Sequence, residues 1–160
     1  MKKPDTPKTH AIRFLLGHEI SFEFCRYKYE ARGGTKVSSR ELGVNEHAVI
    51  KTLIMETDAK DPLIVLMHGD KAVSTKQLAR FLKVKSVTPC APKMADRHSG
   101  YRVGGTSPFG TRRIMPVYAE ATVLDLECMY INAGRQGLLV RVDPRDVVKV
   151  LNVTLVQVAI

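Results

Sequence analysis

Hydrophobic positions along the chain switch between strand-like and helix-like spacing. The run "DPLIVLMHG" (61–69) is almost continuously apolar and predicts a strand buried on both faces. "VIKTLIMET" (49–57) predicts a second strand, and the turn "DAKDP" between the two runs predicts a hairpin. "STKQLARFLKV" (74–84) has helical spacing, which places Leu78, Ala79, Phe81 and Leu82 on the inner side of an amphipathic helix.

The other segments continue this mixture. An N-terminal helix is predicted with Thr6 as its N-cap and Pro7 as its first residue. A serine-capped short helix is expected from residue 38 to Gly43, followed by a second helical turn. Further strands are predicted within 21–27, 85–90, 115–123, 128–133, 136–143 and 153–160, and further helices within 92–100 and 143–152. This order predicts one mixed α/β domain over residues 1–160, built around a curved, largely antiparallel sheet.

The net charge of the chain indicates an anionic binding partner. The 160 residues carry 25 Lys and Arg against 16 Asp and Glu, a net charge of +9. Such an excess is typical of proteins that contact a polyanion such as nucleic acid, although it also serves solubility alone. No apolar run is long enough to span a membrane, and the short N-terminal run contains Arg13 and lacks a cleavage pattern. We therefore expect a cytoplasmic protein without a membrane partner.

Side chains that commonly hold metals or attack substrates form no pattern. The three cysteines, Cys25, Cys90 and Cys128, contain no C-x-x-C pair and are expected to be buried thiols. The histidines have no shared metal spacing and are expected at the surface or in caps; they are His10, His18, His47, His68 and His98. No metal and no cofactor is expected. An enzyme of this composition would rely on backbone donors, a lysine or the substrate's own groups.

A glycine-rich stretch, "GYRVGGTSPFG" (100–110), is the first candidate site. Glycines permit positive φ and bring backbone N–H groups close to an anion or a developing oxyanion, but they also build tight corners. Arg112 and Arg113 follow directly, and a donor-rich loop beside two cations suits phosphate. A second glycine turn, "NAGRQG" (132–137), is either a simple hairpin turn or a route by which Arg135 reaches the same cleft.

Lys51 is the second candidate, because it lies at the head of an otherwise apolar strand. It either extends out at the end of the sheet or points into a site.

Three segments together, "KTL" (51–53), "SGYRVGGTSPFG" (99–110) and "YINAGRQG" (130–137), resemble the YbaK/EbsC family over residues 11–159. That family comprises free-standing relatives of the editing domain inserted in bacterial prolyl-tRNA synthetases. The resemblance implies an α/β fold with a barrel-like, mostly antiparallel sheet flanked by helices. It implies removal of a wrong amino acid from tRNA, cysteine on tRNA(Pro) or tRNA(Cys) first, without a metal. In that chemistry the substrate thiol attacks its own ester and leaves as a thiolactone, while the protein positions the ester and stabilises charge.

The resemblance also implies site residues. Lys51, Gly104 and Gly105 match the catalytic positions, and the implied tRNA contacts are Arg112, Arg113 and Arg135. The implied substrate-binding set is Tyr27, Thr52, Thr106, Ser107, Pro108, Asn132, Gly134, Gly137 and Leu139. The implied partners are the aminoacylated 3′ end of tRNA and prolyl-tRNA synthetase.

The chain departs from the family pattern at two positions, with Gln136 in place of an arginine and Leu139 in place of an aspartate. Loss of a carboxylate that would pair with the substrate ammonium leaves the amino acid open, and alanine is the first alternative. An amino acid without a thiol requires attack by water. Two other hypotheses are a non-catalytic module that binds tRNA or a synthetase, and a small-molecule phosphate binder built on the arginines.

Overall fold

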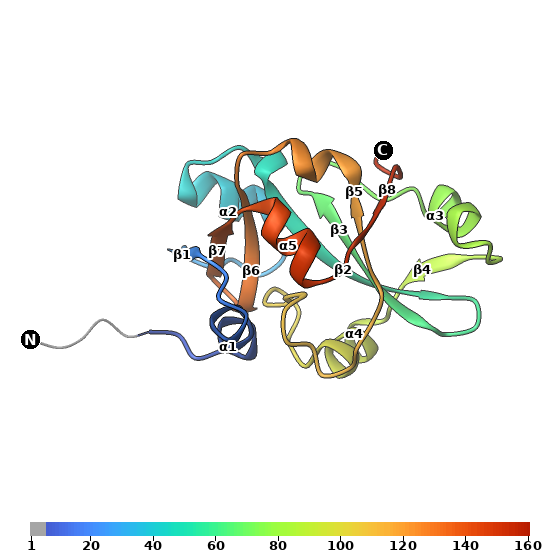
Figure 1. The fold of residues 1–160 in the computed structure, drawn as a ribbon, viewed down its shortest axis with the longest axis horizontal. Coiled ribbons are helices and arrows are strands. Elements are labelled where there is room, and N and C mark those ends of the chain that lie inside the picture. Colours follow the sequence, from blue (N-terminus) through green and yellow to red (C-terminus); the bar gives the residue numbers. More distant parts are fainter. Residues whose placement is uncertain (1–5) are drawn as a thin grey trace, which may run out of the picture.

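One curled sheet organises the computed structural model, which describes residues 6–160 (Figure 1). Seven strands follow one another in the order β1-β7-β6-β2-β3-β5-β8, and β4 pairs with β2 beside this path. The strands are β1 (Phe22–Arg26), β2 (Val49–Thr57), β3 (Pro62–His68), β4 (Val87–Pro89), β5 (Val117–Glu120), β6 (Met129–Arg135), β7 (Leu138–Val142) and β8 (Thr154–Val156). The α-helices are α1 (His10–Gly17), α2 (Gly34–Leu42), α3 (Thr75–Leu82), α4 (Pro92–Ser99) and α5 (Pro144–Val150), and short 3-10 turns cover η1 (Glu46–Ala48) and η2 (Ala121–Asp125).

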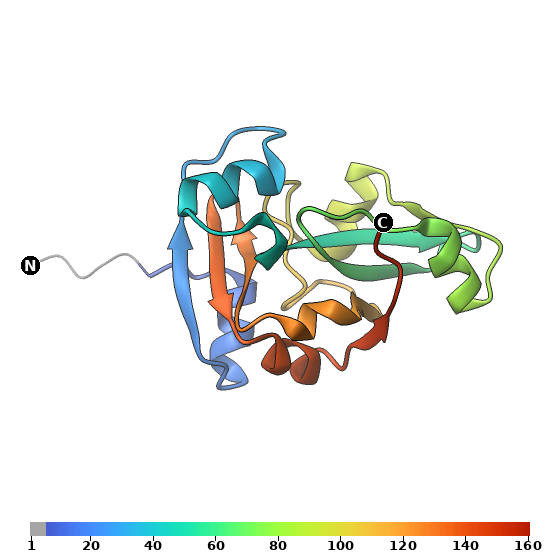
Figure 2. The same ribbon diagram turned by 90° about the horizontal axis from the view of Figure 1, so that it is seen from above.

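The strand pairing confirms the predicted mixed α/β class and the hairpin between β2 and β3. Four pairs are antiparallel (β1·β7, β6·β7, β2·β3 and β2·β4) and three are parallel (β2·β6, β3·β5 and β5·β8). In Figure 2 the strands β1, β7 and β6 run crosswise to β2 and β3, so the sheet is strongly curled. The curl stays open, because β1 and β8 end the path without pairing with each other. Barrel-like therefore means curved here, and not closed.

Two hydrophobic cores lie on the two faces of this sheet. The larger contains α1 residues such as Ile12 and Leu15, and the smaller contains Leu78 and Ala79 of α3. The inward positions predicted for α3 hold for this buried pair, but Phe81 is 50% exposed and lies edge-on to Tyr118 instead.

Two predicted helix starts are wrong by several residues. α1 begins at His10, because Thr9 is the N-cap: its Oγ1 accepts from the Ile12 N–H and donates to the Ala133 carbonyl of β6. α2 begins at Gly34 without any side-chain cap, and the serines expected to start it lie inside it. In both helices a tertiary contact or a glycine turn fixed the start, and the local cap signal did not.

Burial of the cysteines and histidines differs in part from expectation. Cys90 is buried, whereas Cys25 and Cys128 are half-buried. His68 and His98 are buried rather than superficial. His68 is held between the His47 carbonyl (2.7 Å) and the Thr122 hydroxyl (2.7 Å), which satisfies both ring nitrogens. Within residues 6–160, no helix is long and apolar enough to cross a membrane, and no three metal-binding side chains gather.

Candidate functional site

A pocket of about 480 Å³ opens where β2 lacks a neighbouring strand on one edge. β2 pairs with β6 only at Val49 and Ile50, and with β4 only from Met55 onward. Antiparallel pairing with β3 on the opposite edge continues throughout, so its alternation directs the Thr52 amide and carbonyl away from β3 and into this gap. The neighbouring Ile54 carbonyl faces the same way and accepts from the Cys90 N–H (3.0 Å). The floor of the pocket is therefore main chain.

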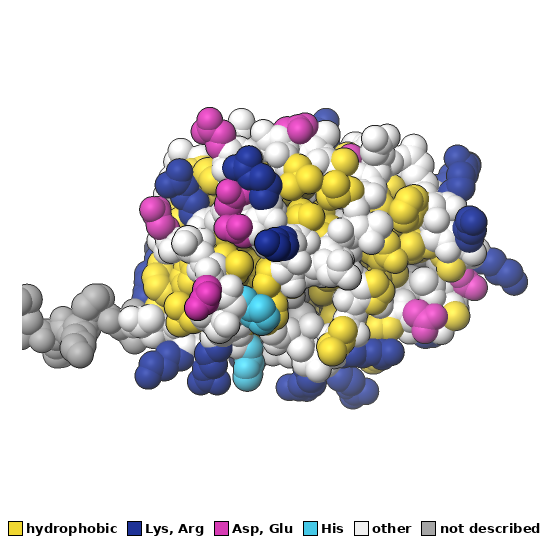
Figure 3. Space-filling view, viewed as in Figure 1, with side chains coloured by type: hydrophobic (Ala, Val, Ile, Leu, Met, Phe, Trp, Pro, Cys, Tyr) yellow, Lys and Arg dark blue, Asp and Glu magenta, His cyan; other side chains and the backbone are white. Residues whose placement is uncertain are grey.

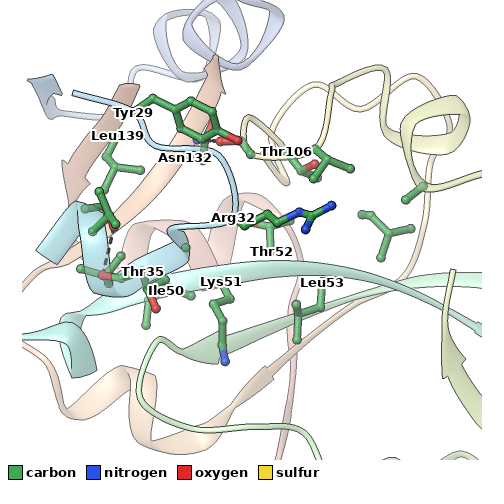
Figure 4. Close-up of a pocket in the computed structure, with 18 of the residues that line it drawn as sticks. Tyr29, Arg32, Thr35, Ile50, Lys51, Thr52, Leu53, Thr106, Asn132 and Leu139 are labelled. Atoms are coloured by element: carbon green, nitrogen blue, oxygen red, sulfur yellow. Dashed lines mark hydrogen bonds between the residues drawn. The ribbon is translucent and has the colours of Figure 1, made fainter. Parts of the chain in front are cut away.

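Four segments form the walls of this pocket (Figure 4). They are the loop from β1 with the first turns of α2, the segment from β4 into α4, the glycine-rich loop that follows α4, and the facing residues of β6 and β7. Of the residues predicted from the sequence, seven line the pocket: Tyr27, Lys51, Thr52, Gly104, Thr106, Asn132 and Leu139. The three distant segments of the family resemblance thus meet in one cavity.

Close packing explains the glycines of the first loop. Gly104 has φ +87°, and a Cβ there would lie 2.5 Å from the Tyr29 hydroxyl. A Cβ on Gly105 would lie 3.0 Å from the main chain of Arg135 and Gln136. The stretch is therefore a tight corner, and that corner also forms a wall of the pocket.

Asn132 joins the two glycine loops. Its Nδ2 donates to the Gly104 carbonyl (3.0 Å) and the Arg135 carbonyl (3.2 Å), and its Oδ1 accepts from the Gly134 N–H (2.7 Å). The pairing of β6 with β7 shifts between Asn132 and Arg135, and such an irregularity turns the side chain toward the pocket. Gln136 adds a second link, because its Nε2 donates to the Val103 carbonyl (2.9 Å).

The backbone donors of the first loop are not equivalent. The Gly105 N–H donates to the Arg102 carbonyl (2.8 Å) within the turn, whereas the exposed Gly104 N–H has no acceptor among the described residues. Ser107 is fully buried outside the pocket, and its Oγ accepts from the Phe109 N–H (3.3 Å). Pro108 is buried beside it. Gly104 is therefore one donor of this loop that remains available to a ligand.

Lys51 contributes its side chain to the pocket lining, but its ammonium group lies on the far side of β2. Figure 4 shows the amine directed away from Thr52 and Arg32, and it donates to the Lys71 carbonyl. Burial lowers the pKa of Lys51 below its usual 10.5, while the nearby carboxylates of Glu46 and Asp70 act in the opposite direction. The amine is thus held across β2 from the pocket interior, in a partly desolvated position.

Sequence reasoning missed two side chains from the irregular loop between β1 and α2. Tyr29 packs against Gly104, and the guanidinium of Arg32 extends between Thr106 and β2 in Figure 4. Arg32 has φ +62° and makes no hydrogen bond or ion pair with the described residues. A single non-glycine residue at positive φ leaves no pattern in the sequence, so only the fold shows that this cation faces the site.

The thiol of Cys90, which also lines the pocket, is unreactive. Burial, reinforced by Glu56, raises the pKa of the Cys90 thiol to about 11, which leaves it protonated at neutral pH. Cys90 therefore lines the pocket as an apolar group and offers no thiolate nucleophile.

The three predicted arginines lie in different places. Arg112 and Arg113 are exposed, follow α4 and line neither pocket, because their backbones bond to the end of that helix. Arg135, with Gly137, lines a second cavity behind Tyr27 and Tyr29. In Figure 3, Lys and Arg side chains gather along the lower edge of the molecule, over α1 and α4. Exposed basic residues of those segments include Lys8, Arg13, Lys93, Arg97, Arg112 and Arg113.

Comparison with known proteins connects this geometry to a family. A family model described as "Aminoacyl-tRNA editing domain" matches residues 33–150. An Enterococcus faecalis (strain ATCC 700802 / V583) protein named "Putative Cys-tRNA(Pro)/Cys-tRNA(Cys) deacylase EbsC" is 23% identical over 152 residues, covering 94% of this chain and 93% of the relative. A "Proline--tRNA ligase" of Levilactobacillus brevis (strain ATCC 367) is 26% identical over 92 residues, which are 58% of this chain but 16% of that enzyme.

Two crystal structures share the fold. A hypothetical protein superposes with a TM-score of 0.87 at 20% identity, covering 95% of this chain and all of the other. A protein described as "a putative trans-editing enzyme for prolyl tRNA synthetase" superposes with a TM-score of 0.81 at 16% identity, covering 96% of this chain and 98% of the other.

Proposed function

This chain belongs to the aminoacyl-tRNA editing domain family, and from that premise we propose that it is a trans-acting deacylase that removes cysteine from Cys-tRNA(Pro) and Cys-tRNA(Cys). The observation that carries the proposal is the convergence of Lys51, Thr52 and both glycine loops on one pocket inside the matched region. The substrate is the aminoacylated 3′ end of tRNA, and the basic lower edge of the molecule suits its phosphates. A cytoplasmic location and an association with prolyl-tRNA synthetase are parts of the same proposal.

The ester carbonyl is polarised by main chain in this mechanism. The Gly104 N–H, which lacks an acceptor among the described residues, donates to the carbonyl oxygen as negative charge develops there. The Thr52 amide at the floor holds the aminoacyl group from the other side. The ammonium of Lys51 leaves the Lys71 carbonyl and stabilises the same charge or the neighbouring ribose oxygen. Tyr27 forms the wall against the terminal adenosine.

The nucleophile comes from the substrate. The cysteine sulfur forms a bond to its own carbonyl carbon, the bond from that carbon to the ribose oxygen breaks, and the thiol proton passes to the released oxygen. The products are a thiolactone and a tRNA with a free hydroxyl. This route needs no nucleophile from the protein, which agrees with a buried Ser107 and a protonated Cys90.

Leu139 favours a second candidate amino acid. It is 4% exposed and lines the pocket where the family pattern has an aspartate, so the wall offers no carboxylate to the substrate ammonium at that position. An apolar wall suits a small apolar side chain, and alanine is the corresponding substrate. Alanine has no thiol, so water would attack the carbonyl instead.

The deciding experiment is deacylation of Cys-tRNA(Pro), Cys-tRNA(Cys) and Ala-tRNA(Pro) by the purified protein, beside Lys51→Ala and Lys76→Ala. Loss of Lys51 should slow cleavage about 100-fold, the effect typical of removing one charge-stabilising group. Lys76→Ala removes an exposed lysine from α3, which lines neither pocket, and should leave the rate unchanged. Selective cleavage of the alanyl ester would replace cysteine by alanine in the proposal. Binding of tRNA without cleavage of any of the three esters would contradict the proposed activity.

A further inference from the structure

A second cavity, about 260 Å³, lies directly behind the first. Tyr27 and Tyr29 line both cavities, so their side chains form the partition between them. The rest of the second cavity comes from the end of β1, from the turn between β6 and β7, and from the buried Pro7 of the N-terminal segment. These two tyrosines therefore separate a ligand in the first pocket from the second cavity.

The second cavity is cationic. Arg26 and Arg135 line it, and no carboxylate does. Arg135 is exposed, and its guanidinium makes no hydrogen bond or ion pair with the described residues. Its backbone, in contrast, is fixed, because the Arg135 carbonyl accepts from Asn132 Nδ2 (3.2 Å). A cation without a partner on a fixed backbone is preorganised for an anionic ligand.

The scaffold of this cavity is equally fixed. The Tyr27 N–H donates to the Gly137 carbonyl (3.0 Å), and a Cβ on Gly137 would lie 2.8 Å from the Tyr27 carbonyl. Strand β1 and the β6–β7 turn therefore keep a constant separation, with an aromatic ring on one side and a guanidinium on the other. An aromatic face beside a bidentate phosphate donor is the combination that reads unpaired nucleotides.

We propose that this second cavity binds the nucleotide that precedes the terminal adenosine of the RNA strand, with Arg135 on the connecting phosphate and a tyrosine ring against the base. This inference rests on the proposed function, because it assigns the continuation of the strand whose ester occupies the first pocket. It predicts that the protein contacts the last two nucleotides of the RNA strand and not the terminal one alone. An aminoacyl-adenosine, which lacks the connecting phosphate, is then an incomplete substrate.

The test compares Arg135→Ala with Arg80→Ala, which removes the same charge from an exposed residue of α3 outside both cavities. Cleavage of an aminoacylated minihelix that ends in CCA is measured beside cleavage of the corresponding aminoacyl-adenosine. Arg135→Ala should lower kcat/KM for the minihelix about tenfold and leave aminoacyl-adenosine unchanged, as expected for one lost charge-assisted contact. Arg80→Ala should change the minihelix value about twofold or less, the weak effect of an exposed charge. Equal losses from both variants, or an equal loss on both substrates, would overturn the assignment.

Binding of an uncharged CCA trinucleotide, followed by fluorescence anisotropy, separates this inference from the proposed activity. The salt slope of binding, log K against log salt, should fall by about 0.7 in Arg135→Ala, the value for one single-strand phosphate contact. A protein that cleaves no ester but shows this change refutes the activity and retains the cavity. Competition by free CMP as strong as that by CCA would show a mononucleotide site and refute the strand assignment.

Discussion

The side-chain amide of Asn132 donates to the Gly104 carbonyl at 3.0 Å, and this bond connects the two glycine loops across the pocket. Asn132 uses both of its donor positions and its carbonyl oxygen on main-chain groups. Asn132, which the sequence predicts to bind substrate, therefore sets the distance between the two glycine loops.

Replacing Asn132 by aspartate should damage the site without changing its size. The carboxylate cannot donate, so it would face the Gly104 and Arg135 carbonyls without a bond, at a cost of about 1–3 kcal/mol in unfolding free energy. Cleavage of mischarged tRNA should fall at least tenfold if the loop separation sets activity. Chemical denaturation and single-turnover kinetics measure the two effects.

Asn45→Asp is the matched control. Asn45 uses only its Oδ1, which accepts from the His47 N–H at 3.0 Å, and aspartate retains that oxygen. Similar losses from both substitutions would show that a general charge effect, and not the link between the loops, is responsible.

Alanine at position 104 should distort the pocket wall. A Cβ there would lie 2.5 Å from the Tyr29 hydroxyl and 2.9 Å from its ring, and φ +87° is unfavourable for any residue with a side chain. We expect a loss of about 1–3 kcal/mol in stability, with activity reduced at least tenfold. Gly17→Ala serves as control, because nothing lies within 4 Å of its Cβ position and its φ is not positive. Wild-type kinetics for Gly104→Ala would refute a role for this backbone segment.

The pH dependence of the reaction should carry the signature of Lys51. Burial depresses its pKa below 10.5, so the cation is lost as the pH rises through this lowered value. If the charged form is required, the enzymatic rate, corrected for cleavage in buffer alone, should decline on the alkaline side below pH 10.5. Lys51→Arg stays protonated and should be slower but free of that decline. An identical alkaline limb in both proteins would assign it to another group.

Ser107→Ala should leave catalysis intact. Ser107 is fully buried, and its hydroxyl supports the Phe109 N–H, so removing it costs about 1 kcal/mol of stability. The cleavage rate at 25 °C should stay within about twofold of wild type, whereas loss of a serine nucleophile lowers rates by several orders of magnitude. Thermal unfolding and deacylation of one substrate are sufficient to distinguish these outcomes.

The sequence predicted the elements whose stabilising contacts are local or uniformly apolar. The runs at 49–57 and 61–69 form the predicted hairpin, and Ser74 caps α3 through the Gln77 N–H. Parallel neighbours such as β6 beside β2 were not predictable, because residues about 80 positions apart meet there and leave no local period. The start of α1 illustrates the same limit, since Thr9 is fixed by Ala133 of a distant strand.

Site residues divide in the same way. The glycine motifs and Lys51 could be found as pocket-lining positions, because backbone constraints and a cation within an apolar strand restrict the residue type. Tyr29 and Arg32 were not, because an irregular loop carries them and only tertiary packing against Gly104 turns that loop into a wall. That the Gly105 amide is already occupied was likewise not predictable, since its hydrogen bond to the Arg102 carbonyl forms only in the folded loop.

The gap in the pairing of β2 assigns the holding of a ligand to the pocket floor and its selection to the pocket walls. Its floor presents peptide groups, which every substitution short of a proline leaves in place, whereas its walls consist of side chains from loops, helices and the strands β6 and β7. In the proposed reaction, anchoring of the ester can therefore remain constant while replacements in the walls, at Leu139 of β7 or Arg32 of the loop after β1, alter which amino acid fits. Proteins that share this sheet can therefore change which amino acid they accept through substitutions in the pocket walls, while the main-chain floor stays the same.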